Sequence, residues 1–494
     1  MINMTRTARN GGHIRLFLLL LCWLIAVTIS TAAEDDDGQQ PSPAANRFGV
    51  VEGMWFPEMT CDLGVGWERL IFDWAAHQPT GPDEFVGFLN IPDEWLTNAA
   101  ACGREIVAVV KNVPEWATDG IVGAGVPRGL YLPVDDPDNL WANFMRQTAA
   151  YYAPRGVTRF IILNEPDIQF GTYGFEFDGT LEDYFMMVKV GTIAAREGNP
   201  AARIHLAGTT YWHDVNSGER LYTDRLLERI AADPDAAEYD GYFDALSLHI
   251  YFRTDSVYDI VSVYRRLLDQ HGFEDKQIWI VETNASPNRD PDWLVERPQF
   301  QITLAQQAAY VVQAAAQALA AGVERIAVYK LYDQLLPEGA ESFGILNPAT
   351  RETRPAFVAW QTVIAHLHDV ADAEISRNER ANVVRARHHN GRQTVIAWAR
   401  TEQAATLSIS ATGDKAYLVH QSGETRIIRP TDGRYALDLP AAECESGAEG
   451  CVVGGAVWML VQPEGAIRVY EVDRRGEREM IFGEVMSSIP QPSD

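Results

Sequence analysis

Short, almost wholly apolar runs alternate with longer segments of helical periodicity between residues 47 and 367. The runs are rich in β-branched residues, and polar positions rarely interrupt them. They cover residues 47–56, 67–74, 104–112, 159–167, 203–212, 243–251, 276–284 and 325–333. Parallel strands have this composition when both of their faces are covered, because neither face meets water. The pattern therefore predicts eight buried parallel strands.

Helical patterns fill most of the gaps between these strands. The clearest are residues 181–197 and 304–322, and the second ends at Gly322, a residue that commonly stops a helix. Eight strand–helix units predict an α/β protein with a (β/α)8 barrel. An open doubly wound sheet is the alternative. No glycine-rich phosphate-binding motif follows the first run, so nothing favours a nucleotide-binding version of that sheet.

After about residue 370 the apolar runs become short and alternate with polar positions. Gly, Asp and Pro separate them, which is typical of an antiparallel β-sandwich. We therefore expect a (β/α)8 barrel at 46–368 and a smaller β-sandwich domain at 369–472. The last segment, 473–494, is charged and then rich in Ser and Pro, and it is predicted to be a flexible tail.

The N-terminal segment has the layout of a secretory signal peptide. Three arginines precede an apolar stretch at 16–29, and small residues follow at 31–33. We expect a cleaved signal peptide at 1–33, then an acidic linker at 34–45, and no integral membrane domain in the mature chain. The protein is thus expected to be secreted or extracytoplasmic. An uncleaved N-terminal anchor is the alternative, because the apolar stretch approaches the length of a membrane span.

Composition and charge narrow the range of partners. The 494 residues are 47% hydrophobic and 22% charged, as in ordinary globular proteins. The formal net charge of −27 repels phosphate backbones, so a nucleic acid partner is not expected. The oligomeric state is left open.

Four cysteines lie outside the predicted signal peptide. Cys444 and Cys451 flank a short loop, and a disulfide between them is expected in an exported protein. Cys61 and Cys102 either pair or remain buried thiols. None of the four has zinc-ligand spacing, so neither a metal site nor a cofactor is predicted.

Two glutamates occupy the positions where barrel enzymes carry their chemistry. Glu165 lies near the end of the fourth run and Glu282 near the end of the seventh. Side chains at the C-terminal ends of barrel strands point into a shared cup, and these two strands face each other across it. Opposed carboxylates suit glycoside hydrolysis: one protonates the leaving oxygen, and the other attacks the anomeric carbon or activates water.

The motifs "ILNEPD" and "IVETN" that carry these glutamates resemble clan A glycoside hydrolases of family 39 or family 5. The resemblance covers the whole barrel. It implies that Glu165 is the general acid/base and Glu282 the nucleophile. "LSLHIY" resembles the strand on which the clan often places a His or Tyr against the nucleophile, and Arg69 resembles an arginine on its second strand. The clan commonly has a Trp at the end of the eighth strand, where this chain has Tyr329 and Tyr332. The identity of the sugar therefore stays open.

Further residues are expected around the pair. Asn164 would bind the sugar 2-hydroxyl or tie down its loop. His249 and Tyr251 share one strand face, so either could donate to Glu282 or simply belong to the core. Arg69 would orient Glu282 or form an ion pair within the barrel.

Aromatic rings near the strand ends are candidate sugar platforms or core residues. They are Trp55, Trp74, Trp116, Trp212, Tyr329 and Tyr332. Asn112 and Glu115 are candidates for binding substrate hydroxyls. Asp73 and Asp333 are rival carboxylates at strand ends.

The sequence therefore predicts a secreted retaining glycoside hydrolase. It would cleave β-O-glycosidic bonds of poly- or oligosaccharides by a two-glutamate double displacement. An inactive barrel that serves as a carbohydrate-binding or cell-surface scaffold is the alternative. The sugar, the linkage, the choice between exo and endo action and the role of the β-domain are left open.

Overall fold

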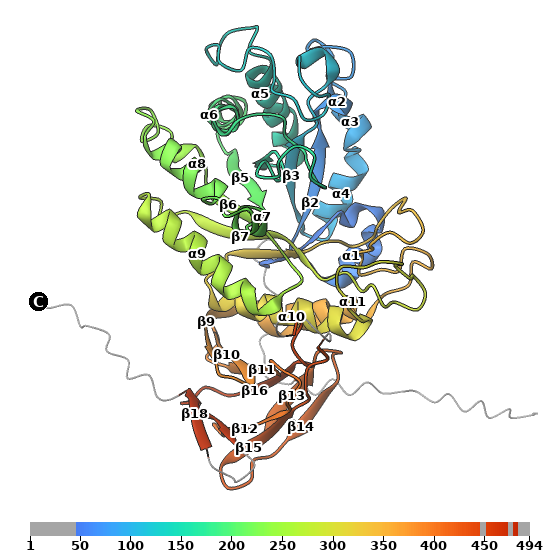
Figure 1. The fold of residues 1–494 in the computed structure, drawn as a ribbon, viewed down its shortest axis with the longest axis vertical. Coiled ribbons are helices and arrows are strands. Elements are labelled where there is room, and N and C mark those ends of the chain that lie inside the picture. Colours follow the sequence, from blue (N-terminus) through green and yellow to red (C-terminus); the bar gives the residue numbers. More distant parts are fainter. Residues whose placement is uncertain (1–45, 445–450, 473–477, 483–494) are drawn as a thin grey trace, which may run out of the picture. The chain divides into compact units, whose positions relative to one another are not determined.

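Eight parallel strands close into a barrel in the computed structural model, which describes residues 46–444, 451–472 and 478–482 (Figure 1). The predicted (β/α)8 fold is confirmed, and each strand lies inside one of the eight apolar runs. The strands are β1 (Phe48–Val51), β2 (Trp67–Asp73), β3 (Glu105–Lys111), β4 (Arg159–Ile162), β5 (Arg203–Thr209), β6 (Ala245–Tyr251), β7 (Gln277–Asn284) and β8 (Arg325–Val328).

Helices connect the strands and surround the barrel (Figure 1). They are α1 (Pro57–Leu63), α2 (Trp74–His77), α3 (Gly87–Asn90), α4 (Asp93–Ala101), α5 (Leu140–Tyr152), α6 (Leu181–Gly198), α7 (Trp212–Ser217), α8 (Tyr222–Ala231), α9 (Val257–Gln270), α10 (Leu304–Ala320) and α11 (Pro355–Leu367). The two helices predicted most clearly are α6 and α10. Each begins with a capping box, in which Thr180 or Thr303 exchanges hydrogen bonds with the residue three positions later. None of the described helices has both the length and the apolar composition needed to cross a membrane.

The interior of the barrel is filled by side chains. Trp67 and Trp279 meet at its centre with ring centroids 5.2 Å apart. Glu105, which lies opposite Trp67 in the neighbouring strand, forms ion pairs with Arg159 and Arg325, at 2.9 and 2.5 Å. Because this interior is packed, a substrate can reach inward-pointing side chains only at the strand ends.

The C-terminal region forms two antiparallel sheets, which confirms the predicted β-sandwich-like domain. One sheet has the order β14-β13-β16-β11-β10-β9, and the other β15-β12-β17-β18. Apolar side chains from both sheets, such as Leu407, Ile409 and Leu460, form a shared core. The strands are β9 (Val370–Arg377), β10 (Ala381–His388), β11 (Gln393–Ala399), β12 (Ala405–Ser410), β13 (Ala416–His420), β14 (Thr425–Ile428), β15 (Arg434–Leu439), β16 (Trp458–Gln462), β17 (Val469–Val472) and β18 (Arg478–Phe482).

Strand β18 corrects part of the tail prediction. Residues 478–482 lie in the segment expected to be flexible, yet they pair antiparallel with β17. Phe482 is 8% exposed and packs into the sandwich core, so burial of this side chain offsets the cost of ordering the strand. The predicted signal peptide, the acidic linker and the rest of the tail lie outside the described residues.

Both pairs of cysteines form disulfides. The predicted Cys444–Cys451 bond is confirmed. The structure also settles the question that the sequence left open, because Cys61 in α1 is bonded to Cys102 just after α4. This second bond joins two helices that cover neighbouring barrel strands.

Helix α10 contacts barrel strands β7 and β8 on one side and β9 and β10 of the β-domain on the other (Figure 1). Buried glutamines make the polar contacts. Gln313 donates to the carbonyl of Gly455 at 2.8 Å and accepts from the N–H of Gly454 at 3.0 Å. Gln306 donates to the carbonyl of Glu443 at 2.8 Å. These bonds fix the β-domain to the barrel by its backbone.

Replacing Gln313 by Ala is expected to lower the free energy of unfolding by about 2 kcal/mol, because a buried N–H and a buried carbonyl lose their partners. Urea denaturation measures the change. Gln270→Ala, at the exposed C-terminal end of α9, is the matched control and should have little effect. Equal losses in the two variants would contradict a role for the Gln313 bonds.

Candidate active site

The carboxylates of Glu165 and Glu282 converge at the C-terminal end of the barrel. One oxygen of each lies within 4.8 Å of the other and of a nitrogen of His249. Strand β4 ends at Ile162, and the chain then turns sharply, with φ 63° at Leu163 and 43° at Glu165. Such left-handed backbone costs about 1–3 kcal/mol in residues other than glycine. A hydrogen bond of 3.1 Å from the N–H of Glu165 to the carbonyl of Gly208 in β5 helps to hold it.

Glu282 is 6% exposed, and polar partners hold both of its oxygens. Arg69 Nη1 lies 2.6 Å from Oε1, and the hydroxyl of Tyr251 donates to Oε2. The other terminal nitrogen of Arg69 donates to Asn164 Oδ1 at 2.5 Å. Arg69 therefore connects Asn164, the residue before Glu165, to Glu282.

His249 lies between the two carboxylates. Its Nδ1 is hydrogen-bonded to Glu165 Oε1 at 2.6 Å, and its Nε2 is 3.6 Å from Glu282 Oε1. The sequence predicted that either His249 or Tyr251 would donate to Glu282. In the structure Tyr251 makes this hydrogen bond, whereas His249 is hydrogen-bonded to Glu165. Gly208 makes room for the ring, since a Cβ there would lie 2.1 Å from Nε2.

A local irregularity between β6 and β7 sets this arrangement. The parallel register shifts between Leu248 and His249, so that His249 lies opposite Glu282. Such a bulge redirects the side chains that follow it. Here it places His249 directly beside Glu282 at the C-terminal ends of the two strands.

The surroundings of Glu282 favour its ionised form. Burial raises the pKa of this carboxyl, but the charges of His249 and Arg69 and the hydrogen bond from Tyr251 outweigh burial and hold the pKa below its usual 4.5. His249 is affected in the complementary way. Burial lowers its pKa, but the nearby carboxylates of Glu282 and Glu165 prevail and raise it above 6.5. The same contacts thus favour the charged form of both groups, the imidazolium of His249 and the carboxylate of Glu282.

These shifts predict the acid limb of the pH profile. A carboxylate with a lowered pKa stays ionised until the pH falls through that pKa, so the acid limb of kcat/KM should lie below pH 4.5. In Arg69→Met one lowering influence is lost, and the limb should move up by about one pH unit or more. The pH dependence of kcat/KM measures this. Arg266→Met, on the exposed side of α9, is the control and should leave the acid limb unchanged. An unchanged acid limb in Arg69→Met would contradict its assignment to the ionisation of Glu282.

Glu165, His249 and Glu282 are also the group among the described residues whose composition and spacing could hold a metal ion. The group already has cationic partners. Arg69 Nη1 lies against one oxygen of Glu282, and His249 is placed to carry a proton. The arrangement suits proton transfer between carboxyl groups better than coordination of a cation.

Solved structures provide the comparison with known proteins. A family 39 glycoside hydrolase from Bacteroides cellulosilyticus superimposes with a TM-score of 0.63 at 14% identity, over 85% of this chain and 82% of that one. A monomeric beta-xylosidase from Caulobacter crescentus gives 0.55 at 13% identity, over 85% and 96%. The catalytic domain of a family 30 xylanase from Talaromyces cellulolyticus gives 0.54 at 14% identity, over 84% and 96%.

The chain shares its fold, a closed (β/α)8 barrel, with these glycoside hydrolases of families 39 and 30. The structural resemblance that the strand-end motifs predicted is thereby confirmed. No protein-family model matches the chain, and no curated protein matches it either. At 11–14% identity the likeness extends to the fold, and the chemistry has to be argued from this chain's own residues.

Within this glycoside hydrolase fold, the rival carboxylates have structural partners. Asp73 caps α2 by accepting from the N–H of Ala76 at 3.0 Å. It also accepts from Asn112 at 2.7 Å, so the amide of Asn112 is committed to a neighbouring loop. Asp333 accepts from the N–H of Gly344 at 2.6 Å. Neither aspartate belongs to the converging group.

The candidate aromatic residues divide between core and surface. Trp74 is fully buried in the core, and Trp116 is half-buried with its N–H bonded to Gln78. Trp212 is 36% exposed at the start of α7. The ring centroid of Tyr329 lies 5.9 Å from that of Tyr251, so among these residues Tyr329 contacts a partner of Glu282. Trp55 and Tyr332 line a separate pocket beside β1 and β8.

The structure adds ion pairs at the strand ends that the sequence did not single out. Glu52 follows β1, and its carboxylate lies 2.5 Å from the ammonium of Lys330, which follows β8. The charge of Lys330 contributes to the low pKa of Glu282. Lys111 at the end of β3 pairs with Glu176. Glu52, Lys111 and Lys330 are charged residues within apolar runs, and Glu176 lies in the loop after the fourth run. A charge in such a position was the available signal.

Proposed function

We propose that the protein is a retaining glycoside hydrolase that cleaves β-O-glycosidic bonds of oligo- or polysaccharides outside the cytoplasm. The observation that carries this proposal is the approach of the Glu165 and Glu282 oxygens to within 4.8 Å. Retaining enzymes hold their two carboxyl groups about 5–5.5 Å apart, whereas inverting enzymes leave about 6.5–9.5 Å for a water molecule.

In the proposed first step Glu282 attacks the anomeric carbon while Glu165 gives its proton to the leaving oxygen. The low pKa of Glu282 keeps the nucleophile ionised, and Arg69 and Tyr251 hold its oxygens in place. In the second step Glu165 takes a proton from water, and the water displaces Glu282 from the sugar. Asn164, held by Arg69, is placed beside Glu165 to bind the sugar 2-hydroxyl.

The two disulfides support an extracytoplasmic location, because such bonds persist in oxidising compartments. The predicted signal peptide agrees with this. The catalytically inactive scaffold remains the alternative. However, four groups hold the pKa of the buried Glu282 below its usual value, and an ionised buried carboxylate would give a scaffold no advantage.

A panel of aryl β-glycosides tests the proposal. Hydrolysis of at least one member is expected, and NMR in the first minutes should show the β-anomer of the released sugar. Release of the α-anomer first would contradict the double displacement. No turnover of any member would favour the scaffold.

A further inference from the structure

A pocket of about 300 Å³ lies between the loops that follow β1 and β8. Its walls are largely aromatic, with the rings of Phe56 and Tyr332 in edge contact at 5.1 Å. The indole N–H of Trp55 is buried without a hydrogen-bond partner among the described residues. The lining residues are Trp55, Phe56, Tyr332, Gln334, Leu335 and Arg351.

This pocket belongs to the same end of the barrel as the carboxylate pair. Strands β1 and β8 pair in parallel, and the N–H of Leu331 continues the pairing to the carbonyl of Val51 at 3.1 Å. Tyr332 follows three residues after Tyr329, whose ring contacts Tyr251. A sugar chain bound at Glu282 can therefore extend toward the pocket.

Arg351 gives the pocket its charge. Its side chain is exposed, and it forms no ion pair or side-chain hydrogen bond with any residue that the structure describes. Other cations at this end of the barrel are paired: Arg69 with Glu282, and Lys330 with Glu52. The chain has a net charge of −27 and thus many carboxylates, yet this guanidinium has none of those that the structure describes as its partner. Its planar group of N–H donors is therefore free to bind an anionic ligand between the aromatic rings.

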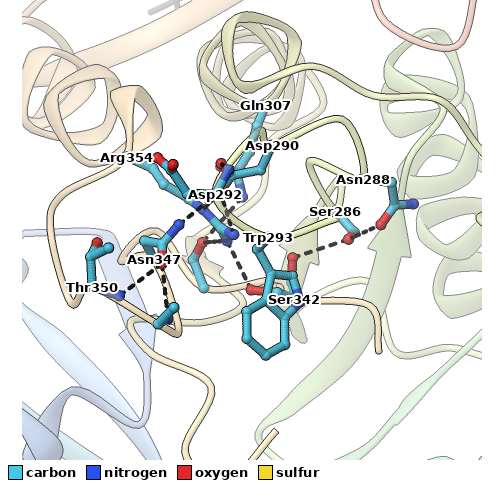
Figure 2. A network of polar contacts seen from close by, with 12 residues as sticks. Ser286, Asn288, Asp290, Asp292, Trp293, Gln307, Ser342, Asn347, Thr350 and Arg354 are labelled. Atoms are coloured by element: carbon cyan, nitrogen blue, oxygen red, sulfur yellow. Dashed lines mark hydrogen bonds and ion pairs between the residues drawn. The ribbon is translucent and has the colours of Figure 1, made fainter. Parts of the chain in front are cut away.

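The loop that carries Arg351 is held in shape by the polar network shown in Figure 2. Asn347 accepts from the N–H of Thr350 at 3.0 Å and donates to Asp290 at 3.1 Å. Asp290 in turn forms a buried ion pair of 2.8 Å with Arg354. Arg351 lies between Thr350 and Arg354, which these bonds anchor. Little backbone entropy is therefore lost when its side chain binds a ligand.

We propose that this pocket is a subsite for an anionic sugar, one that carries a carboxylate or a sulfate ester, next to the sugar that is hydrolysed. The proposal rests on the proposed glycosidase function. Arg351 would form paired hydrogen bonds to the anionic group, while the rings of Trp55 and Tyr332 cover the apolar faces of the sugar. A neutral sugar would leave the guanidinium without a partner.

Calorimetric titration of the full chain tests this without turnover, in a Glu282→Gln background. The probes are oligosaccharides of glucuronoxylan, of polygalacturonate and of chondroitin sulfate, each beside its carboxyl-reduced or desulfated form. At least one acidic probe is expected to bind about tenfold more tightly than its neutral counterpart. Arg351→Gln should abolish this preference. Arg266→Gln, with the same change in charge on α9, should retain it.

The pattern of binding separates the possible outcomes. A preference for uronates alone or for sulfated sugars alone supports the subsite and identifies its anion. The proposal is overturned if no acidic probe is preferred, or if Arg351→Gln keeps the preference. Because binding is measured without hydrolysis, such a failure leaves the glycosidase assignment intact. Conversely, a preference that depends on Arg351 would survive a failure to hydrolyse aryl glycosides.

Discussion

Replacing Glu282 by Gln is expected to reduce kcat for a β-glycoside by about 10⁴-fold or more, as loss of the central group of other catalytic sites does. The amide has the same shape and can still accept the hydrogen bond from Tyr251, but it cannot form the glycosyl–enzyme bond. Steady-state kinetics on the aryl glycoside that is turned over fastest measures the loss.

Two controls accompany this variant. Glu94→Gln removes an exposed carboxylate in α4 and should keep full activity. Thermal unfolding of Glu282→Gln shows whether the buried Arg69, now without its anionic partner, has disrupted the fold. A 2-deoxy-2-fluoro glycoside should label Glu282 in the parent chain, and a label on a different carboxylate would contradict the assignment.

Replacing Glu165 by Ala is expected to give a loss that depends on the leaving group. For alkyl glycosides or disaccharides, kcat/KM should fall by about 10²–10⁴-fold, because the departing oxygen is no longer protonated. For a dinitrophenyl glycoside, which needs no proton, kcat/KM should change little. Azide should then accelerate turnover, since it replaces the water that Glu165 would have activated, and it should yield the β-glycosyl azide.

Asp167→Asn is the matched control for this second variant. Asp167 lies two residues beyond Glu165, but its carboxylate accepts from the N–H and hydroxyl of Thr210, at 2.8 and 2.7 Å. Any loss in this variant should be the same for good and poor leaving groups. If Glu165→Ala also lost activity uniformly, Glu165 would not be the acid/base.

The barrel could be predicted because its signal is local. Each buried strand needs apolar residues on both faces. Each helix needs an apolar face and a residue that ends it, such as Gly322. A window of about ten to twenty residues therefore contains the pattern. Asn164, Glu165 and Glu282 were found for the same reason, since each directly follows or ends such a window. The tail was the weak point: the five residues of β18 lie between a charged segment and one rich in Ser and Pro, and that composition predicted no strand.

Partner choice within the site could not be predicted. The sequence placed His249 and Tyr251 on one strand face, but the register shift before His249 decides that Tyr251 reaches Glu282 while His249 bonds to Glu165. The link from Arg69 to Asn164 joins residues 95 positions apart. Spacing along the chain contains no information about either contact.

The sequence by itself determined the strand and helix pattern, and the two strand ends that carry carboxylates, because burial repeats with a short period along the chain. Only the tertiary structure decided the distance between those carboxylates and the pairing of Cys61 with Cys102. It also decided that Arg351, unpaired among the described residues, lies in the pocket beside Trp55 and Tyr332. Each of these depends on how distant segments meet when the barrel closes. That meeting is set by strand register and loop packing, which involve the whole fold at once.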